Sequence, residues 1–266
     1  MVTATGHSPA QLASLVLSAM APARHLALLL DYDGTLVPIE RRPELAKADP
    51  ELPLLLDRLA EHPRVSVAVV SGRGLDDLRN VLGRGSRFYL FAEHGAVGAW
   101  PDGTVNPLLE DVDVGEFARV RLRLKDVVWP EGVWVEEKQL ALALHTREAP
   151  RPNVSRAHEL FHQAVREMDP SRRLSVTVGK EILEVRPPGL DKGLVVDWLR
   201  DRLADVSPLL VAVGDDRTDE DAFSRLGHGD FAIHVGDPRR DTTAEFRLAD
   251  PHAVRMFLHG VSAGLT

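Results

Sequence analysis

The sequence predicts an α/β fold: a Rossmann-like three-layer core with a mostly parallel sheet, plus an inserted smaller α+β cap domain. Two observations predict the core. Short apolar runs recur, each followed by a turn and a helical pattern, at residues 25–30, 65–70, 88–92, 209–213 and 231–235. Uninterrupted apolar runs are typical of parallel strands that are covered on both faces. Strands that alternate with helices then indicate right-handed crossovers within one sheet.

The middle of the chain carries the third observation, a change of pattern that predicts the inserted domain. We place the insert at residues 103–187 and the core at residues 1–102 and 188–266, with a Pro-Asp-Gly turn signal just before the insert. The elements expected within the insert are a helix with an apolar stripe at 117–127, a strand at Val133–Thr146, a helix near Asn153–Met168, and a hairpin of Leu174–Val178 and Ile182–Arg186.

Composition bounds the function classes. The 266 residues are 44% hydrophobic and 27% charged, which is typical of a globular protein with a sizeable core. A net charge of −8, with 5% aromatic residues, disfavours a nucleic-acid partner, which would require a basic face. The absence of cysteine excludes disulfides, zinc–cysteine sites and cysteine nucleophiles, and it permits a reducing compartment.

The N-terminal apolar run, Leu12–Ala23, resembles the central part of a signal peptide. No Lys or Arg precedes Arg24, so the basic segment of a signal peptide is missing. Leu12, Leu15, Val16 and Met20 fit one face of a short amphipathic helix instead. No apolar run approaches the roughly 18 residues of a membrane span. We therefore expect a cytoplasmic protein without a membrane partner.

Two carboxylates follow the first predicted strand, in the run Leu30-Asp31-Tyr32-Asp33-Gly34. In open α/β sheets, ligands bind at the carboxyl ends of the strands. Asp31 and Asp33 would meet in one crevice, where a cation such as Mg²⁺ would offset their repulsion. One carboxylate can then attack phosphorus while the other carries a proton. The alternative is a simple capped turn, with Asp33 or Thr35 starting a helix.

Two further motifs offer groups that hold a phosphate. Ser71-Gly72-Arg73 follows a predicted strand, and its hydroxyl can donate to a phosphate oxygen, although Ser71 can equally cap a helix. Lys192 precedes an amphipathic helix and can neutralise charge on a nucleophile and a phosphoryl group. A solvent-exposed lysine is the alternative at that position.

Acidic residues crowd the end of the predicted strand 209–213. Five of the seven positions 215–221 are Asp or Glu, so they repel one another without a cation. Glu220 and Asp221 are explained as acids at a helix N-terminus. Asp215 is better explained as a metal ligand, with Asp219 as a second candidate. Together, these motifs supply the parts of a metal-dependent phosphatase at one edge of a sheet.

In this order, the motifs Asp31-x-Asp33-Gly34-Thr35, Ser71-Gly72-Arg73, Lys192 and Gly214-Asp215-Asp216 resemble those of the haloacid dehalogenase superfamily of phosphatases. The resemblance implies that Asp31 is the nucleophile and that Asp33 is the general acid and then the general base. It implies that Ser71 and Lys192 hold the phosphoryl group and that Arg73 contacts the substrate. It also implies Mg²⁺ on Asp31, the Asp33 backbone carbonyl and Asp215.

Further motifs narrow the resemblance to trehalose-6-phosphate phosphatases: residues 31–39, Glu93-His94-Gly95, residues 214–223, Glu136-Glu137-Lys138, His145-Thr146-Arg147, Gly179-Lys180 and Glu184–Pro187. The resemblance implies hydrolysis of trehalose 6-phosphate, the last step of trehalose biosynthesis, and a functional link to a trehalose-6-phosphate synthase. It implies that the insert is a mobile cap. Its sugar contacts would be Glu136, Lys138, Lys180 and Glu184.

One expectation from strand geometry supports these contacts. Glu136 and Lys138 are two apart on a predicted strand, so they share a face, which we expect to continue as Leu140, Leu142 and Leu144. A surface ion pair is the alternative for Glu136 and Lys138.

Other functions stay open: a phosphatase for sucrose phosphate or a phosphorylated glycosylglycerate, a phosphotransferase, or a silent domain that binds a sugar phosphate. The family often has a tyrosine where this chain has Thr146.

Overall fold

The structure is a computed structural model that describes residues 7–20, 24–40, 42–109, 113–179 and 181–265. The chain divides into two compact units. The core unit joins Met1–Leu108 with Asp191–Thr266, and the inserted unit is Leu109–Leu190. Among the described residues, no helix is both long and apolar enough to cross a membrane.

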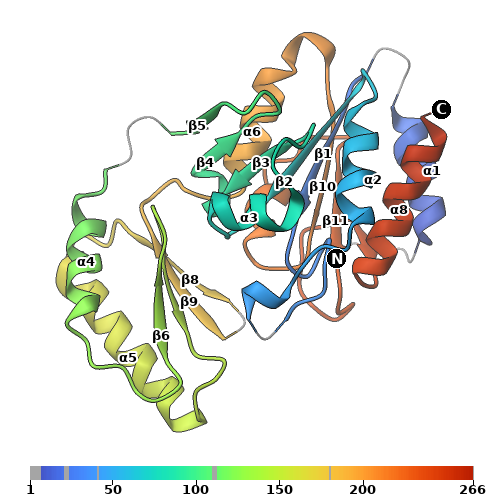
Figure 1. The fold of residues 1–266 in the computed structure, drawn as a ribbon. Coiled ribbons are helices and arrows are strands. Elements are labelled where there is room, and N and C mark those ends of the chain that lie inside the picture. The colour runs from blue at the N-terminus through green and yellow to red at the C-terminus, as the bar shows by residue number, and fades with distance from the viewer. Residues whose placement is uncertain (1–6, 21–23, 41, 110–112, 180, 266) are drawn as a thin grey trace. The chain divides into compact units, whose positions relative to one another are not determined.

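An eight-stranded sheet forms the middle of the core unit (Figure 1), in the order β12-β11-β10-β1-β2-β3-β4-β5. The strands from β12 to β3 pair in parallel, and β4 and β5 add antiparallel pairs at one edge. The bounds of the strands are β1 (Leu26–Asp31), β2 (Val65–Val70), β3 (Tyr89–Ala92), β4 (Val97–Ala99), β5 (Val105–Pro107), β10 (Leu209–Gly214), β11 (Phe231–Val235) and β12 (Phe246–Leu248).

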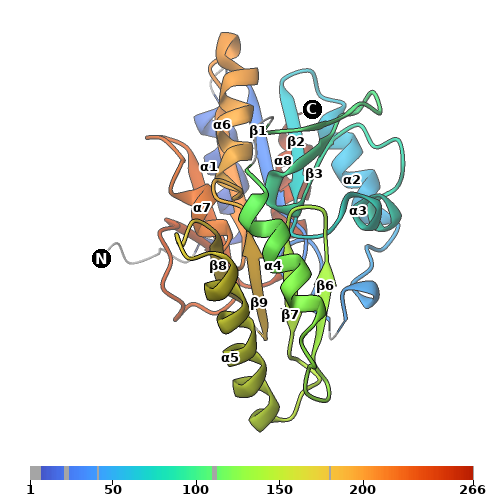
Figure 2. The same cartoon turned by 90° about the vertical axis from the view of Figure 1, so that its left-hand side faces the viewer.

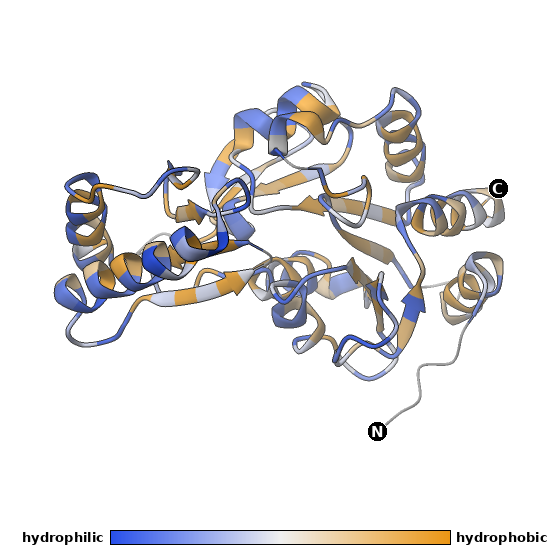
Figure 3. Ribbon diagram, turned by 90° about the horizontal axis from the view of Figure 1, so that it is seen from below, coloured by the Kyte–Doolittle hydropathy of each residue, from blue (hydrophilic) through white to orange (hydrophobic). Residues whose placement is uncertain are grey.

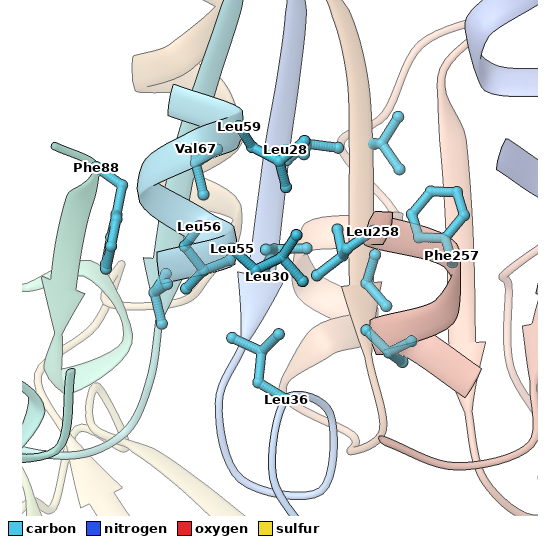
Figure 4. Close-up of a cluster of buried hydrophobic side chains, with 14 of the residues drawn as sticks. Leu28, Leu30, Leu36, Leu55, Leu56, Leu59, Val67, Phe88, Phe257 and Leu258 are labelled. Atoms are coloured by element: carbon cyan, nitrogen blue, oxygen red, sulfur yellow. The ribbon is translucent and has the colours of Figure 1, made fainter. Parts of the chain in front are cut away.

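Helices cover both faces of this sheet. One face is packed by α1 (Pro9–Ala19), α2 (Glu51–Ala60), α3 (Leu75–Leu82) and α8 (Pro251–Gly264), and the other by α6 (Gly193–Arg202) and α7 (Asp219–Phe223). Leu28 and Leu30 of β1 point into the first layer, with α2 and α8 around them (Figure 4), whereas Leu29 points into the second. Because successive side chains leave a strand on opposite faces, a strand covered on both must be apolar throughout.

The predicted three-layer, mostly parallel core is thus confirmed. Figure 3 shows the hydrophobic residues concentrated on the strands of the large sheet, while the helices carry residues of both kinds. The predicted N-terminal helix is α1, whose Ser8 caps it by accepting a hydrogen bond from the backbone N–H of Gln11. Leu12, Val16 and Met20 are buried as expected, but Leu15 is exposed.

The inserted unit is a four-stranded antiparallel sheet in the order β6-β7-β9-β8, with two helices (Figure 2). The bounds of its elements are α4 (Gly115–Lys125), β6 (Trp134–Glu137), β7 (Leu142–His145), α5 (Arg151–Met168), β8 (Ser175–Gly179) and β9 (Ile182–Arg186). Phe117 of α4 and Phe161 of α5 pack in one cluster with Leu144 and Leu183 of the sheet. Both helices therefore cover the same face of the sheet.

The single strand expected at Val133–Thr146 is wrong. Residues 134–137 and 142–145 form two strands that pair antiparallel, with Glu136 opposite Ala143. The backbone N–H of Lys138 donates to the carbonyl of Ala141 at 2.9 Å and closes the turn. Arg121 of α4 also donates to the carbonyls of Lys138 (2.9 Å) and Gln139 (2.7 Å), which holds the turn from outside.

This turn changes which side chains share a face. Leu140 lies in the turn, and Leu142 and Leu144 of β7 pack in the cluster beneath the sheet. Glu136, opposite Ala143, is on the other face, and so is Glu184, because Ala143 is also paired with Glu184. The predicted continuation of the Glu136 face as leucines is therefore wrong: this face of the insert is polar.

Candidate active site

The carboxyl ends of parallel strands bring the predicted catalytic groups of the core unit together. Leu30 of β1 is paired with Val213 of β10, and Asp31 is paired with Val70 of β2. The residues that follow these positions therefore leave the sheet at one edge. Asp31 ends its strand there, and Ser71 and Asp215 come directly after the neighbouring strands.

Lys192 lies at the centre of the site. Its Nζ donates to Oδ1 of Asp31 at 2.6 Å and to Oδ1 of Asp219 at 2.7 Å, and all three side chains are buried. Burial opposes the charged form of the lysine, but Asp219 and Asp31 outweigh it and raise the pKa of Lys192. The alternative of a solvent-exposed lysine is therefore wrong.

Three carboxylates surround this single ammonium group. Asp31, Asp215 and Asp219 each offer an oxygen atom, and these atoms lie within 4.8 Å of one another. Burial raises the pKa of Asp31 well above its usual range, and the neighbouring carboxylates add to the shift against the opposing charge of Lys192. Burial, followed by repulsion from Asp219 and Asp216, raises the pKa of Asp215 to about 7.

This cluster fits a hard divalent cation. Three carboxylates with one lysine leave excess negative charge in a buried space, and oxygen donors of this kind are the ligands of Mg²⁺ and Ca²⁺. Oδ2 of Asp31 is buried and has no hydrogen-bond partner among the described residues, which is costly unless a ligand contacts it. The three side chains of this cluster are those predicted as metal ligands: Asp31, Asp215 and Asp219.

Glycines let the backbone approach the cluster. Gly34 has φ +88°, in the left-handed region, and a Cβ built on it would clash with the carboxylate of Asp215. The backbone around it is a tight turn, in which Gly34 N–H donates to the carbonyl of Val37. No helix begins at Asp33 or at Thr35, so the capped-helix alternative is wrong.

Asp33 points to a different partner from Asp31. Its carboxylate accepts two hydrogen bonds of 2.7 Å from Arg73, one from Nε and one from Nη2. Asp33 and Arg73 are therefore one ion pair here. The metal contact through the backbone carbonyl of Asp33 and the substrate contact of Arg73 stay predictions.

Ser71 lies in the loop after β2 and is buried. Its Oγ accepts a hydrogen bond from the backbone N–H of Arg73 at 3.1 Å. The following helix, α3, has Gly74 as its N-cap, without a side-chain cap, so Ser71 is not the helix cap of the alternative interpretation. Its hydroxyl at the end of β2 is compatible with the predicted phosphate contact.

The polar face of the inserted sheet carries three of the four predicted sugar contacts. Lys138 Nζ donates to Oε2 of Glu184 at 3.1 Å and lies 4.0 Å from Oε2 of Glu136. That same Glu136 oxygen is 2.9 Å from Nε2 of His145. The fourth predicted contact, Lys180, lies outside the described residues.

Comparison with known proteins shows to which family the chain belongs. The family model described as trehalose-phosphatase matches residues 29–252. The chain belongs to the trehalose-phosphatase family. That span contains every predicted site residue, from Asp31 to Asp219.

Curated members of the family are longer than this chain. A bifunctional trehalose-6-phosphate synthase/phosphatase of Thermoproteus tenax is 37% identical over 248 residues, covering 91% of this chain and 32% of the relative. A trehalose-phosphate phosphatase of Mycobacterium leprae is 32% identical over 274 residues, covering 97% of this chain and 62% of the relative. The chain thus spans less than two thirds of each.

Solved structures of the family share the fold. The trehalose-6-phosphate phosphatase of Aspergillus fumigatus has a TM-score of 0.69 at 28% identity, covering 94% of this chain and 97% of that one. The C-terminal domain of the Candida albicans enzyme has a TM-score of 0.79 at 24% identity, covering 97% and 99%. The predicted family is therefore confirmed.

Two arginines contact residues of this trehalose-phosphatase site but were not predicted from the sequence. Arg240 donates from Nη1 to the carbonyl of Asp215 at 2.8 Å and from Nη2 to Oδ1 of Asp216 at 3.1 Å. Arg225 donates to the carboxylate of Asp191, which accepts the backbone N–H of Gly193 just after Lys192. Arginine is common on surfaces and no spacing links these residues to the motifs, so the sequence carries no signal for them.

Proposed function

We propose that this chain is a phosphatase that hydrolyses trehalose 6-phosphate to trehalose and inorganic phosphate. The observation that carries the proposal is the hydrogen bonding of one buried Lys192 to both Asp31 and Asp219, beside Asp215. Such a centre combines a nucleophile, a charge-neutralising cation and cation ligands. The family and the names of its members supply the substrate.

The chemistry is a double displacement at phosphorus. A carboxylate oxygen of Asp31 attacks phosphorus, the bond from phosphorus to the sugar oxygen breaks, and the carboxyl of Asp33 gives its proton to that oxygen. Asp33 then takes a proton from water, which attacks phosphorus and breaks its bond to Asp31, releasing phosphate. Lys192 and Ser71 hold the oxygens of the phosphoryl group throughout.

The cation is proposed to be Mg²⁺, held by Asp31, Asp215, Asp219 and the backbone carbonyl of Asp33. When bound, it would offset the negative charge on the phosphoryl oxygens. The excess charge of the acidic cluster supports this proposal.

The inserted unit is proposed to act as a cap whose polar sheet face contacts the sugar hydroxyls through Glu136, Lys138, Lys180 and Glu184. Charged groups already hydrogen-bonded to one another, as Lys138 is to Glu184, are held in place to accept a sugar. A functional link to a trehalose-6-phosphate synthase is proposed from the bifunctional relative, and a cytoplasmic location stays a prediction from the sequence.

The test is phosphate release, with and without Mg²⁺, from trehalose 6-phosphate, sucrose 6-phosphate, glucose 6-phosphate and a glycosylglycerate phosphate. Preference for trehalose 6-phosphate supports the proposal. Preference for another sugar phosphate would support the proposed reaction mechanism but contradict the proposed substrate. Inactivity on all four would favour a silent binding domain.

Two neighbouring variants test the cap contacts. Glu136→Gln changes the polar face of the insert, whereas Glu137→Gln changes the next residue of β6, which pairs with Lys125 at 3.4 Å on the other side. We expect KM for trehalose 6-phosphate to rise about tenfold in Glu136→Gln and to stay unchanged in Glu137→Gln, since a lost contact to a charged group costs about 1.5 kcal/mol or more. Equal effects would contradict the assigned face.

A further inference from the structure

The pairing of Arg73 with Asp33 gives the proposed acid a fixed orientation. Nε of Arg73 donates to Oδ2 and Nη2 to Oδ1, each at 2.7 Å, so both carboxylate oxygens are engaged. Two parallel bonds from a planar guanidinium hold both the position and the plane of a carboxylate. The arginine side chain is 7% exposed and the Asp33 side chain 36% exposed. The buried partner therefore holds the accessible one.

Arg73 is itself held by the loop after β2. Its backbone N–H donates to Oγ of Ser71 at 3.1 Å, and its carbonyl accepts the backbone N–H of Glu93 at 2.9 Å. Its guanidinium lies over the ring of Tyr32, 5.0 Å from the centroid. Tyr32 is wholly buried, and its hydroxyl donates to the carbonyl of Ala46 at 3.1 Å. The orientation of Asp33 is thus set by packed core structure.

We infer that Arg73 is a positioning residue that aims the proton-carrying carboxyl of Asp33, rather than a ligand of the substrate; this rests on the proposed phosphatase function. The two nitrogen atoms that form the fork of Arg73 are engaged by Asp33. Proton transfer in a transition state depends steeply on geometry, so a misplacement of about 1 Å costs roughly 10²-fold in rate.

This role predicts a dependence on the leaving group. A sugar alkoxide is a poor leaving group that needs a proton from Asp33 as the phosphorus–oxygen bond breaks. p-Nitrophenolate leaves as a stable anion and needs no such proton. A residue that acts only through Asp33 must therefore affect phosphoryl transfer from the sugar phosphate far more than transfer from p-nitrophenyl phosphate.

The experiment compares Arg73→Gln, Arg73→Lys, Asp33→Asn and the Arg73→Gln/Asp33→Asn double variant in the full chain with Mg²⁺. Steady-state kcat and KM are measured on trehalose 6-phosphate, and the first turnover of p-nitrophenyl phosphate is followed by p-nitrophenolate release. We expect Arg73→Gln to lower kcat on the sugar phosphate 10- to 100-fold, with KM and the first-turnover rate changed less than about threefold.

Two controls separate positioning from a structural role. Lysine keeps the charge but not the two-nitrogen fork of the guanidinium. Arg73→Lys should therefore fold, and it should regain less than half of the kcat that Arg73→Gln loses. The double variant should be no slower on the sugar phosphate than Asp33→Asn, because residues that act as one unit are not additive. If Arg73→Gln does not fold, Arg73→Lys provides the test. Its kcat on the sugar phosphate should then fall by a larger factor than its first-turnover rate on p-nitrophenyl phosphate.

The opposite results are distinct. A rise in KM for trehalose 6-phosphate with kcat unchanged would make Arg73 a substrate ligand, and equal slowing on both substrates would make it a general phosphate or folding residue; either overturns the inference. A wild-type chain that releases phosphate from neither substrate would overturn the proposed function, and the role of Arg73 with it.

Discussion

The Nζ of Lys192 lies 2.6 Å from Oδ1 of Asp31, although 161 positions separate the two residues in the chain. The same ammonium group also donates to Asp219 at 2.7 Å, and Asp215 completes the acidic cluster. One positive charge thus faces three carboxylates in a buried space. Without a cation, this centre stores repulsion that the rest of the core must offset.

The first prediction is that two inactivating variants change stability in opposite directions. Asp31→Asn removes one of three carboxylates and leaves Lys192 paired with Asp219, so the metal-free protein should become about 1 kcal/mol more stable. Lys192→Met leaves the carboxylates without their cation and should destabilise the metal-free protein by about 3 kcal/mol. Urea unfolding in the presence of a chelator measures both.

Turnover of trehalose 6-phosphate should be lost in both variants. Added Mg²⁺ should restore more stability to Lys192→Met than to Asp31→Asn, because only the former keeps all three carboxylates. Stability losses of equal size in the two variants would show that the carboxylates do not repel one another as the geometry indicates.

The second prediction concerns the turn at Gly34. Alanine there would need a positive φ, and its Cβ would clash with the carboxylate of Asp215, so Gly34→Ala should lower activity at least about 10²-fold and destabilise the fold by about 1 kcal/mol or more. Gly74→Ala is the matched control, since Gly74 has φ −65° and a Cβ added there would meet no described atom within 4 Å. Its activity should be unchanged and its stability within about 1 kcal/mol of wild type, as thermal melting and phosphate release would show.

Local chemistry explains why much of this structure follows from the sequence. The run Leu28-Leu29-Leu30 is apolar because both faces of β1 are covered, and Asp31 follows where the sheet ends. The same rule places Ser71 and Asp215 after β2 and β10. The ends of buried strands can therefore be predicted from the sequence wherever an apolar run is followed by polar residues.

Contacts made by side chains far apart in the sequence do not follow in this way. The turn between β6 and β7 contains no glycine, proline or asparagine, and Arg121 of the neighbouring helix holds it. Arg73 is 40 positions from Asp33, and Arg240 is 25 from Asp215. No local pattern marks such pairs, because packing of whole elements brings them together.

The third prediction tests Arg240 as a support for the cation site. Its guanidinium bridges the carbonyl of Asp215 and the carboxylate of Asp216, so Arg240→Gln should loosen Asp215. We expect the Mg²⁺ concentration for half-maximal activity to rise about tenfold, with kcat at saturating Mg²⁺ near wild type. Arg239→Gln is the control, since Arg239 is 88% exposed and pairs with Asp237. An unchanged Mg²⁺ requirement in Arg240→Gln would contradict this role.

The fourth prediction is a pH dependence of stability that originates at His234. This imidazole of β11 is fully buried, and burial, with the charges of Arg247 and Arg240, lowers its pKa. In the unfolded chain a histidine has a pKa of about 6.5, so below that pH the unfolded state binds a proton that the folded state does not. Stability from this group is therefore complete above about pH 6.5 and is lost as pH falls toward the folded pKa.

His234→Gln removes the titrating group and should flatten the pH profile. Between pH 7.5 and 5.5, the free energy of unfolding should fall more in wild type than in the variant, by up to about 1.4 kcal/mol, since each pH unit below the unfolded pKa costs at most that much. The pKa values of His25 and His158 are also lowered by burial, but both groups are present in both proteins and cancel in the difference. Urea unfolding at the two pH values measures it, and parallel profiles would mean that the pKa of His234 is not lowered in the folded protein.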